Sequence, residues 1–127
     1  MTIANYLEAK LLDAALVNSS FKVGVAAPFG ALHTGDPGET GTAAPLASCP
    51  RVAIAFNAAA SSTCTNATTV TFACSATGTV THLSLWDASA TDTANCLWSG
   101  ALATAKVVAN VGDNVQFASA AITVTLD

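Results

Sequence analysis

The last fifty residues, Gly78 to Asp127, constrain the fold more than any other part of the chain. In this stretch β-branched and apolar residues alternate with Thr and Ser, and each run ends at Gly, Asn or Asp. Such alternation, closed by turn residues, is typical of short antiparallel strands. Further strands are expected at 21–26, 51–57 and 69–74. The sequence therefore predicts an all-β fold, an antiparallel sandwich or jelly-roll-like domain of about eight strands.

One helix is expected before the strands, within an N-terminal segment 1–20. Residues 2–17 place Tyr6, Leu7 and Leu11 on one stripe at helical spacing. The whole chain of 127 residues has the size of a single domain. We expect the helical segment to be followed by a β-sandwich over 21–127, with a long loop at 27–48.

The expected loop is rich in Gly and Pro, and a loop of this length in a small domain is usually functional. Its centre, Gly35-Asp36-Pro37-Gly38, has the residue types of a tight turn. A calcium loop would need a ladder of acidic ligands, which is missing around Asp36. We expect neither a metal nor another cofactor.

The low charge of the chain bears on its partners. Charged residues make up 9% of the sequence, whereas soluble domains usually carry about a quarter. A surface with so little charge is typical of a protein that neighbours cover in an assembly. Four scattered cations cannot form the basic stripe that nucleic-acid binding requires. No apolar run is long enough for a membrane span, and Glu8, Lys10 and Asp13 interrupt any signal-peptide core.

Four cysteines offer a test of strand order. They contain no Cys-x-x-Cys pair, so a zinc site is not expected. They are either reduced or oxidised after the protein leaves the cytosol. If the strands 51–57, 69–74, 79–86 and 96–102 form a meander, the pairs in reach are Cys49–Cys74 and Cys64–Cys96. Two other connectivities remain open, as does a bridge from Cys49 to another subunit.

No residue pattern supports catalysis. His82, Asp87 and Cys96 are the obvious candidates, but there is no Gly-x-Ser-x-Gly elbow and no local nucleophile motif. A histidine on a strand is more often packed than catalytic. We therefore expect no enzyme activity.

Six residues are candidates for contacts with other proteins: Tyr6, His33, Asp36, Pro37, Trp86 and Trp98. They belong to, or adjoin, the helix, the loop His33–Cys49 and the segment Asp87–Asn95. Tryptophan is enriched at interfaces, although a place in the core is its default. An alternative hypothesis is a carbohydrate-binding module that stacks sugars on Trp86 or Trp98.

Short motifs along nearly the whole chain resemble those of small tailed-phage virion proteins, commonly labelled phage tail fiber proteins. They are Asn5-Tyr6-Leu7-Glu8, Val23-Gly24-Val25, Thr34-Gly35-Asp36-Pro37-Gly38-Glu39, Arg51-Val52-Ala53, Gly78-Thr79-Val80-Thr81-His82, Leu85-Trp86-Asp87-Ala88, Leu97-Trp98-Ser99-Gly100-Ala101-Leu102, Lys106-Val107-Val108 and Ala121-Ile122-Thr123-Val124-Thr125-Leu126.

The resemblance implies a non-enzymatic structural protein of the virion, made in the host cytoplasm and present in many symmetric copies. The implied partners are further copies of the chain, as a trimer, and other capsid, neck or tail proteins. The chain has no shaft repeat, which favours a collar or capsid-decoration role over a long fiber. In that setting disulfides would help to staple the particle.

Overall fold

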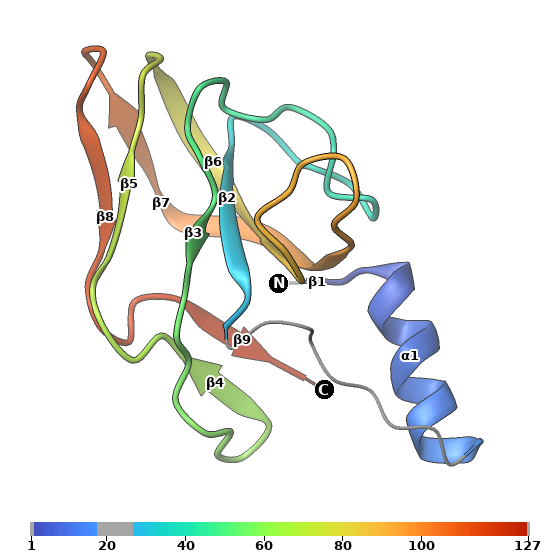
Figure 1. Cartoon of the computed structure of the whole chain (residues 1–127). Coiled ribbons are helices and arrows are strands. Elements are labelled where there is room, and N and C mark those ends of the chain that lie inside the picture. The colour runs from blue at the N-terminus through green and yellow to red at the C-terminus, as the bar shows by residue number, and fades with distance from the viewer. Residues whose placement is uncertain (1, 18–26, 127) are drawn as a thin grey trace.

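The computed structural model describes residues 2–17 and 27–126, and within them one helix and nine short strands. The elements are β1 (Thr2–Ile3), α1 (Asn5–Leu16), β2 (Phe29–His33), β3 (Val52–Ala53), β4 (Thr63–Thr65), β5 (Val70–Ala73), β6 (Gly78–Trp86), β7 (Cys96–Val108), β8 (Asn114–Phe117) and β9 (Thr123–Thr125). The predicted all-β class with an N-terminal helix is confirmed (Figure 1). The strand expected at 21–26 lies outside the described residues.

The strands form one main sheet and two ribbons. The main sheet has the order β1-β7-β6-β2-β3, and the ribbons pair β4 with β9 and β5 with β8. Every pairing is antiparallel. The meander supposed for 51–57, 69–74, 79–86 and 96–102 is right for β6 and β7, which pair, but wrong for the first two strands, because β3 lies beside β2 and β5 lies beside β8. β6 and β7 lie between β5 and β8 in the chain, so local patterns do not reveal that pairing.

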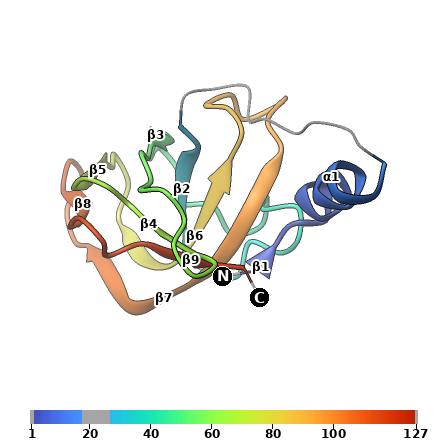
Figure 2. The same cartoon turned by 90° about the horizontal axis from the view of Figure 1, so that it is seen from below.

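The principal core lies between the main sheet and the two ribbons. Leu32 and Leu83 project from the sheet into the same cluster as Phe72 from β5 and Phe117 from β8. The rings of Phe72 and Phe117 meet edge to face, with centroids 6.0 Å apart. Figure 2 shows β5 and β8 on the side of the molecule opposite α1.

A smaller cluster lies on the other face of the main sheet. It contains Ala4, Trp86 and Cys96, with Phe29 and Ala31 packed against them. The register explains this division, since Phe29 pairs with Trp86 and Trp86 pairs with Cys96. Directly paired residues share a face of a sheet. The central strands are therefore buried on both faces.

The sequence failed to predict β2, which occupies residues assigned to the long loop. Pro28 and Gly30 interrupt its pattern, and burial on both faces removes the alternation of apolar and polar residues. Gly30 allows close packing, because a Cβ there would lie 2.5 Å from Ile54 Cδ1 and 3.0 Å from Phe72 Cζ, and these buried side chains would have to shift. The true loop therefore runs from 34 to 51.

Three smaller differences concern strand limits. The segment 58–68, between two expected strands, contains β4, and residues 2–3, expected in the helix, form β1. The strand expected at 96–102 continues to Val108 as one strand, β7. Its register against β6 shifts between Val80 and His82, so β7 continues through an irregularity that resembles a strand end in sequence.

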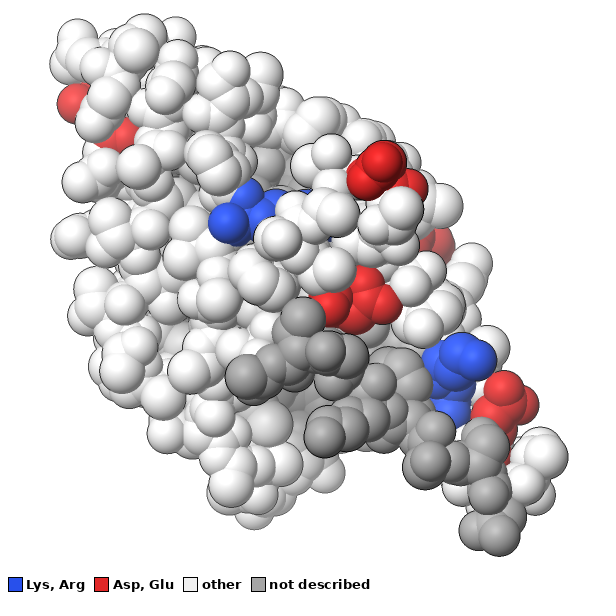
Figure 3. Space-filling model, in the orientation of Figure 1, with Lys and Arg blue, Asp and Glu red and all other residues white. Residues whose placement is uncertain are grey.

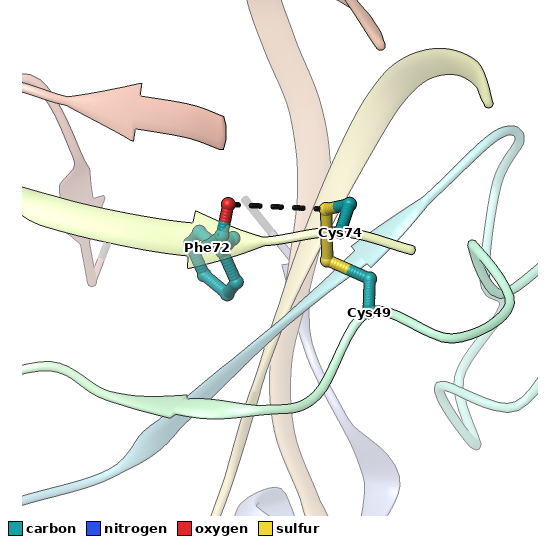
Figure 4. Close-up of a disulfide and its surroundings, with 3 residues drawn as sticks. All are labelled: Cys49, Phe72 and Cys74. Atoms are coloured by element: carbon teal, nitrogen blue, oxygen red, sulfur yellow. Dashed lines mark hydrogen bonds between the residues drawn. A yellow bond between two sulfur atoms is a disulfide. The ribbon is translucent and has the colours of Figure 1, made fainter. Parts of the chain in front are cut away.

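A disulfide joins Cys49, at the end of the loop, to Cys74, which follows β5. Their Cα atoms are 4.3 Å apart (Figure 4). The Cys74 sulfur also lies 3.9 Å from the Phe72 carbonyl oxygen, but an oxidised sulfur has no hydrogen to donate. The bond thus ties the β5–β8 ribbon to the loop that leads into β3.

The other expected pair, Cys64–Cys96, does not form, and both residues are free cysteines. Cys64 lies on the same side of the sheet as Trp98, with which it lines a pocket. Cys96 packs against Trp86 in the cluster on the opposite face. The main sheet separates the two thiols, because the strand order differs from the meander on which the pairing depended.

Replacing both Cys49 and Cys74 with serine should lower the free energy of unfolding by about 3 kcal/mol, the loop-closure effect for a separation of 25 residues. Urea denaturation with and without reductant measures the change. The Cys64→Ser variant is the control and should retain the response to reductant. Equal stability of the double variant and the oxidised protein would contradict the expectation.

Candidate assembly face

The three segments predicted to make contacts lie on one side of the molecule. They are α1, the loop 34–51 and the segment 87–95, which connects β6 to β7 and is called the tip below. A pocket of about 220 Å³ is lined by Tyr6 at the start of α1, Glu39 of the loop and Asn95 of the tip. Figure 1 shows α1, the tip and the first part of the loop on the side of the main sheet away from β5 and β8, while the end of the loop returns toward β5, to which the disulfide ties it. We call their combined surface the loop face.

His33 holds the loop to the sheet. Its Nδ1 lies 2.9 Å from the Ala43 carbonyl oxygen, and its Nε2 lies 2.7 Å from Ser84 Oγ. Trp86 Nε1 donates to the same Ser84 oxygen at 2.7 Å. One tautomer satisfies every group: His33 Nδ1–H donates to Ala43, and Ser84 O–H donates to Nε2. This chain of bonds joins the loop, β2 and β6.

The environment of His33 favours the neutral ring. Burial lowers its pKa below 6.5, and the nearby charges of His82 and Arg51 act in the same direction. The hydrogen bond to Ala43 opposes them with a smaller effect than burial. Protonation would also require Nε2 to donate to Ser84, whose hydroxyl would then lose its acceptor. The loop is therefore held best when His33 is uncharged.

Gly41 allows the loop to pack closely on the sheet. Its φ is +71°, a conformation that favours glycine, and a Cβ at this position would lie 2.6 Å from Cys96 Sγ and 2.7 Å from Trp86 Cζ2. Gly38 has an almost identical φ of +70° but has open space around it. A comparison of the two glycines therefore distinguishes the effect of a positive φ from the effect of close packing.

Arg51 fixes the tip against the loop. Its guanidinium lies 3.7 Å from the centroid of the Trp86 ring and donates hydrogen bonds to the carbonyl oxygens of Ala88 and Ala90. Asp87 closes the other end of the tip by accepting bonds from the Asn95 backbone at 2.7 Å and its side chain at 2.8 Å. A cation on an aromatic face is stabilising, more so when desolvated.

Two connections attach α1 to the same side. β1 pairs with β7 through Thr2 and Ile3, and the Ala4 amide donates to the Leu97 carbonyl oxygen at 2.8 Å. Ala4 is buried in the cluster with Trp86, and Leu7 is the buried residue of the helix. The first turn of α1 is thus fixed to the sheet.

The predicted contact residues have different positions. Asp36 is exposed and accepts a hydrogen bond from Gly38 N at 2.9 Å, as expected for a turn. Pro37 belongs to the same turn and is buried, and Tyr6 is half-buried beside Lys10. His33 and Trp86 are 1% and 3% exposed, so they shape the loop face from below. Trp98 points to the opposite face, toward the ribbons.

These positions bear on the other sequence hypotheses. The Trp86 ring is buried and covered by Arg51, so it presents no open face on which a sugar can stack. Burial raises the pKa of the Cys96 thiol to about 11, an effect that the Arg51 charge only partly offsets. The thiolate that nucleophilic catalysis requires is therefore scarce at neutral pH.

Sequence reasoning missed three residues that build the face: Gly41, Ser84 and Arg51. In the sequence Ser84 is a residue of the strand expected at 79–86, and Arg51 is the first residue of the strand expected at 51–57. Only the pairing of β2 with β6 shows that Ser84 faces His33. A glycine after a turn that already contains two glycines gives no sign that it packs against a tryptophan.

No group of three metal-binding side chains occurs among the described residues, and no helix there is long and apolar enough to cross a membrane. The sequence matches the profile of a family described as Podophage GP4 fiber I protein gp80 (Gp80), over residues 2–125. No curated protein matches the chain. The family match covers the helix, the loop and the nine strands of the described residues.

The Gly41→Ala variant should be less stable than Gly38→Ala by about 1–3 kcal/mol, the usual cost of overpacking. Both variants share the strain of a positive φ, so their difference reports the contact with Cys96 and Trp86. Urea denaturation followed by tryptophan fluorescence measures it. Equal losses for the two variants would show that the loop does not pack on Trp86.

Stability should fall as the pH drops below 6.5. The folded pKa of His33 is lower than the unfolded value, so its contribution is complete above pH 6.5 and is lost as the pH falls through the folded pKa. In His33→Gln this part of the pH dependence should disappear, whereas His82→Gln should retain it. Urea midpoints between about pH 7.5 and 5 provide the test. An unchanged slope in His33→Gln would contradict the assignment.

Proposed function

Because the chain belongs to the Gp80 family of podophage fiber I proteins, we propose that it assembles as a homo-oligomer, a trimer, and joins other virion proteins at the neck or tail. The family makes it a phage fiber-type structural protein. The proposal adds the oligomer, the position and the contact surface. Its role would be adhesive, holding the junction together without catalysis.

The observation that supports the proposal most is the convergence of α1, the loop and the tip on one face. The loop and the tip lie outside the named strands, yet internal hydrogen bonds and the Arg51–Trp86 contact fix them. A surface that is already ordered loses less conformational entropy when it binds. Rigid loops on a scaffold are a common way to build a binding site.

The charges of the loop face indicate the kind of partner. Six of the eight acidic residues belong to α1, the loop or the tip, while only two cations, Lys10 and Arg51, do so. The six are Glu8, Asp13, Asp36, Glu39, Asp87 and Asp92. Figure 3 shows several of them over this side of an otherwise mostly uncharged surface. A partner with a positive surface would complement it.

The disulfide fits the same role. It connects residues of one chain, and it anchors the C-terminal end of the loop next to Arg51. We propose that it stiffens the face from within once the protein is in an oxidising environment. The disulfide would then stabilise each copy internally and would not link one copy to another.

Analytical ultracentrifugation of the purified full chain tests the oligomer, with a concentration-dependent trimer as the expected result. Cross-linking of intact virions followed by mass spectrometry tests the position and should join the loop face to a neck or tail protein. Glu39→Lys with Asp92→Lys should weaken that contact, whereas Asn114→Lys with Gln116→Lys, on β8, should not. A monomer at every concentration, absent from virions, would refute the proposal.

A further inference from the structure

Helix α1 is short, and several large apolar side chains near its C-terminal end are exposed. Leu12, Leu16 and Val17 are 59%, 79% and 70% exposed, and Leu7 is the buried residue of a helix of 12 residues. Isolated helices of this length are marginal in water, and most helices gain their stability by packing an apolar face. The C-terminal turn of α1 therefore presents an exposed apolar surface of the kind that marks a contact site.

A matching apolar pocket lies elsewhere on the same chain. It has a volume of about 350 Å³ and lies between the β4–β9 ribbon and the main sheet. None of the described residues that line it is charged. The lining includes Phe56, Cys64, Leu85, Trp98 and Leu126. Leu126 is itself 43% exposed, so apolar surface continues from the pocket to its rim.

Trp98, which lines the pocket, has an unsatisfied hydrogen-bond donor. Its indole Nε1–H is buried and has no hydrogen-bond partner among the described residues. A buried donor without an acceptor costs about 1–3 kcal/mol. The last turn of a helix carries carbonyl oxygens that no amide of the helix can reach. A docked helix end would bring apolar side chains to the pocket, while its carbonyl oxygens would reach the buried Trp98 Nε1–H only after the indole shifts.

We propose that the C-terminal turn of α1 docks into this pocket on a second copy of the chain. The inference rests on the homo-oligomer of the proposed function and names one of its contacts. Leu12 and Leu16 are one turn apart on the helix, so both side chains can enter a single apolar site. Leu12, Leu16 and the described residues of the pocket lining are uncharged, so none of them has a charge that would have to be desolvated.

A second copy fits better than the same chain. β1 and the Ala4–Leu97 hydrogen bond fix the start of α1 to β7. In both views α1 stands away from β4 and β9, which flank the pocket (Figures 1 and 2). The helix and the pocket are different surfaces of one chain, so their contact is head-to-tail. Such contacts close into a ring when the rotation between copies permits it.

Cys64 offers a direct test, since it lines the pocket, is free and is partly exposed. Leu12→Cys, Leu16→Cys and Val17→Cys would each be made in the full chain and oxidised with diamide. At least one should give disulfide-linked dimers and larger multimers on a non-reducing gel. These should vanish when Cys64 is also replaced by serine, and Val111→Cys, 70% exposed at a distant turn, should not form them.

The alternatives give different results. A disulfide to Cys64 within one chain, identified by mass spectrometry of a monomer band, would overturn docking to a second copy. An oligomer in ultracentrifugation with no cross-link from any of the three positions would overturn this contact but leave the proposed homo-oligomer intact. A monomer at every concentration would refute both this contact and the proposed homo-oligomer.

A second measurement does not depend on cross-linking geometry. Leu12→Gln with Leu16→Gln should raise the concentration at which half the chains are assembled by about tenfold or more. Val107→Gln with Val111→Gln, which removes similarly exposed apolar side chains outside the helix, should leave it unchanged. Equal assembly of the two double variants would also overturn the proposal.

Discussion

The pairing of β2 with β6 is the constraint on which the rest of this structure depends. All five residues of β2 pair with β6, from Phe29 opposite Trp86 to His33 opposite His82. Because both faces of these strands are covered, the polar side chains between them must satisfy one another. His33 and Ser84 do so, and their bonds to Ala43 and Trp86 fix the position of the loop. The core and the loop face are thus set by the same register.

The sequence predicts those parts of the fold whose pattern is local. Val70, Phe72 and Cys74 alternate with polar or small residues, and all three are buried as expected for β5 and its end. β2 has no such signal, because its second residue is glycine and both of its faces are buried. Strand order is likewise invisible, since β5 pairs with β8 more than 40 residues away. The cysteines show the consequence, because proximity of Cys64 to Cys96 depended on a strand order that does not exist.

The candidate face was predictable as segments but not as a site. Turn residues and polarity marked the loop and the tip, and helical spacing marked α1. Their convergence depends on Arg51, which reaches across to the carbonyl oxygens of Ala88 and Ala90, and on Gly41, which lets the loop touch Trp86. Such contacts arise from side chains that meet only after β2, β6 and β7 have paired. Residue patterns in the sequence therefore do not predict these contacts.

The two surfaces of the chain differ in how they would bind. The loop face is acidic and held in place, including non-glycine residues with positive φ at Ala44 and Ser48, conformations that persist only when the surroundings enforce them. Such a surface suits a partner of fixed shape. The end of α1 is apolar and projects from the body, so its stability increases when a neighbour covers it. If copies first join through the helix, each contact orders part of the next copy, and the acidic faces are then presented together. Several weak contacts on one assembled ring bind far more tightly than one, because the later contacts form at high effective concentration.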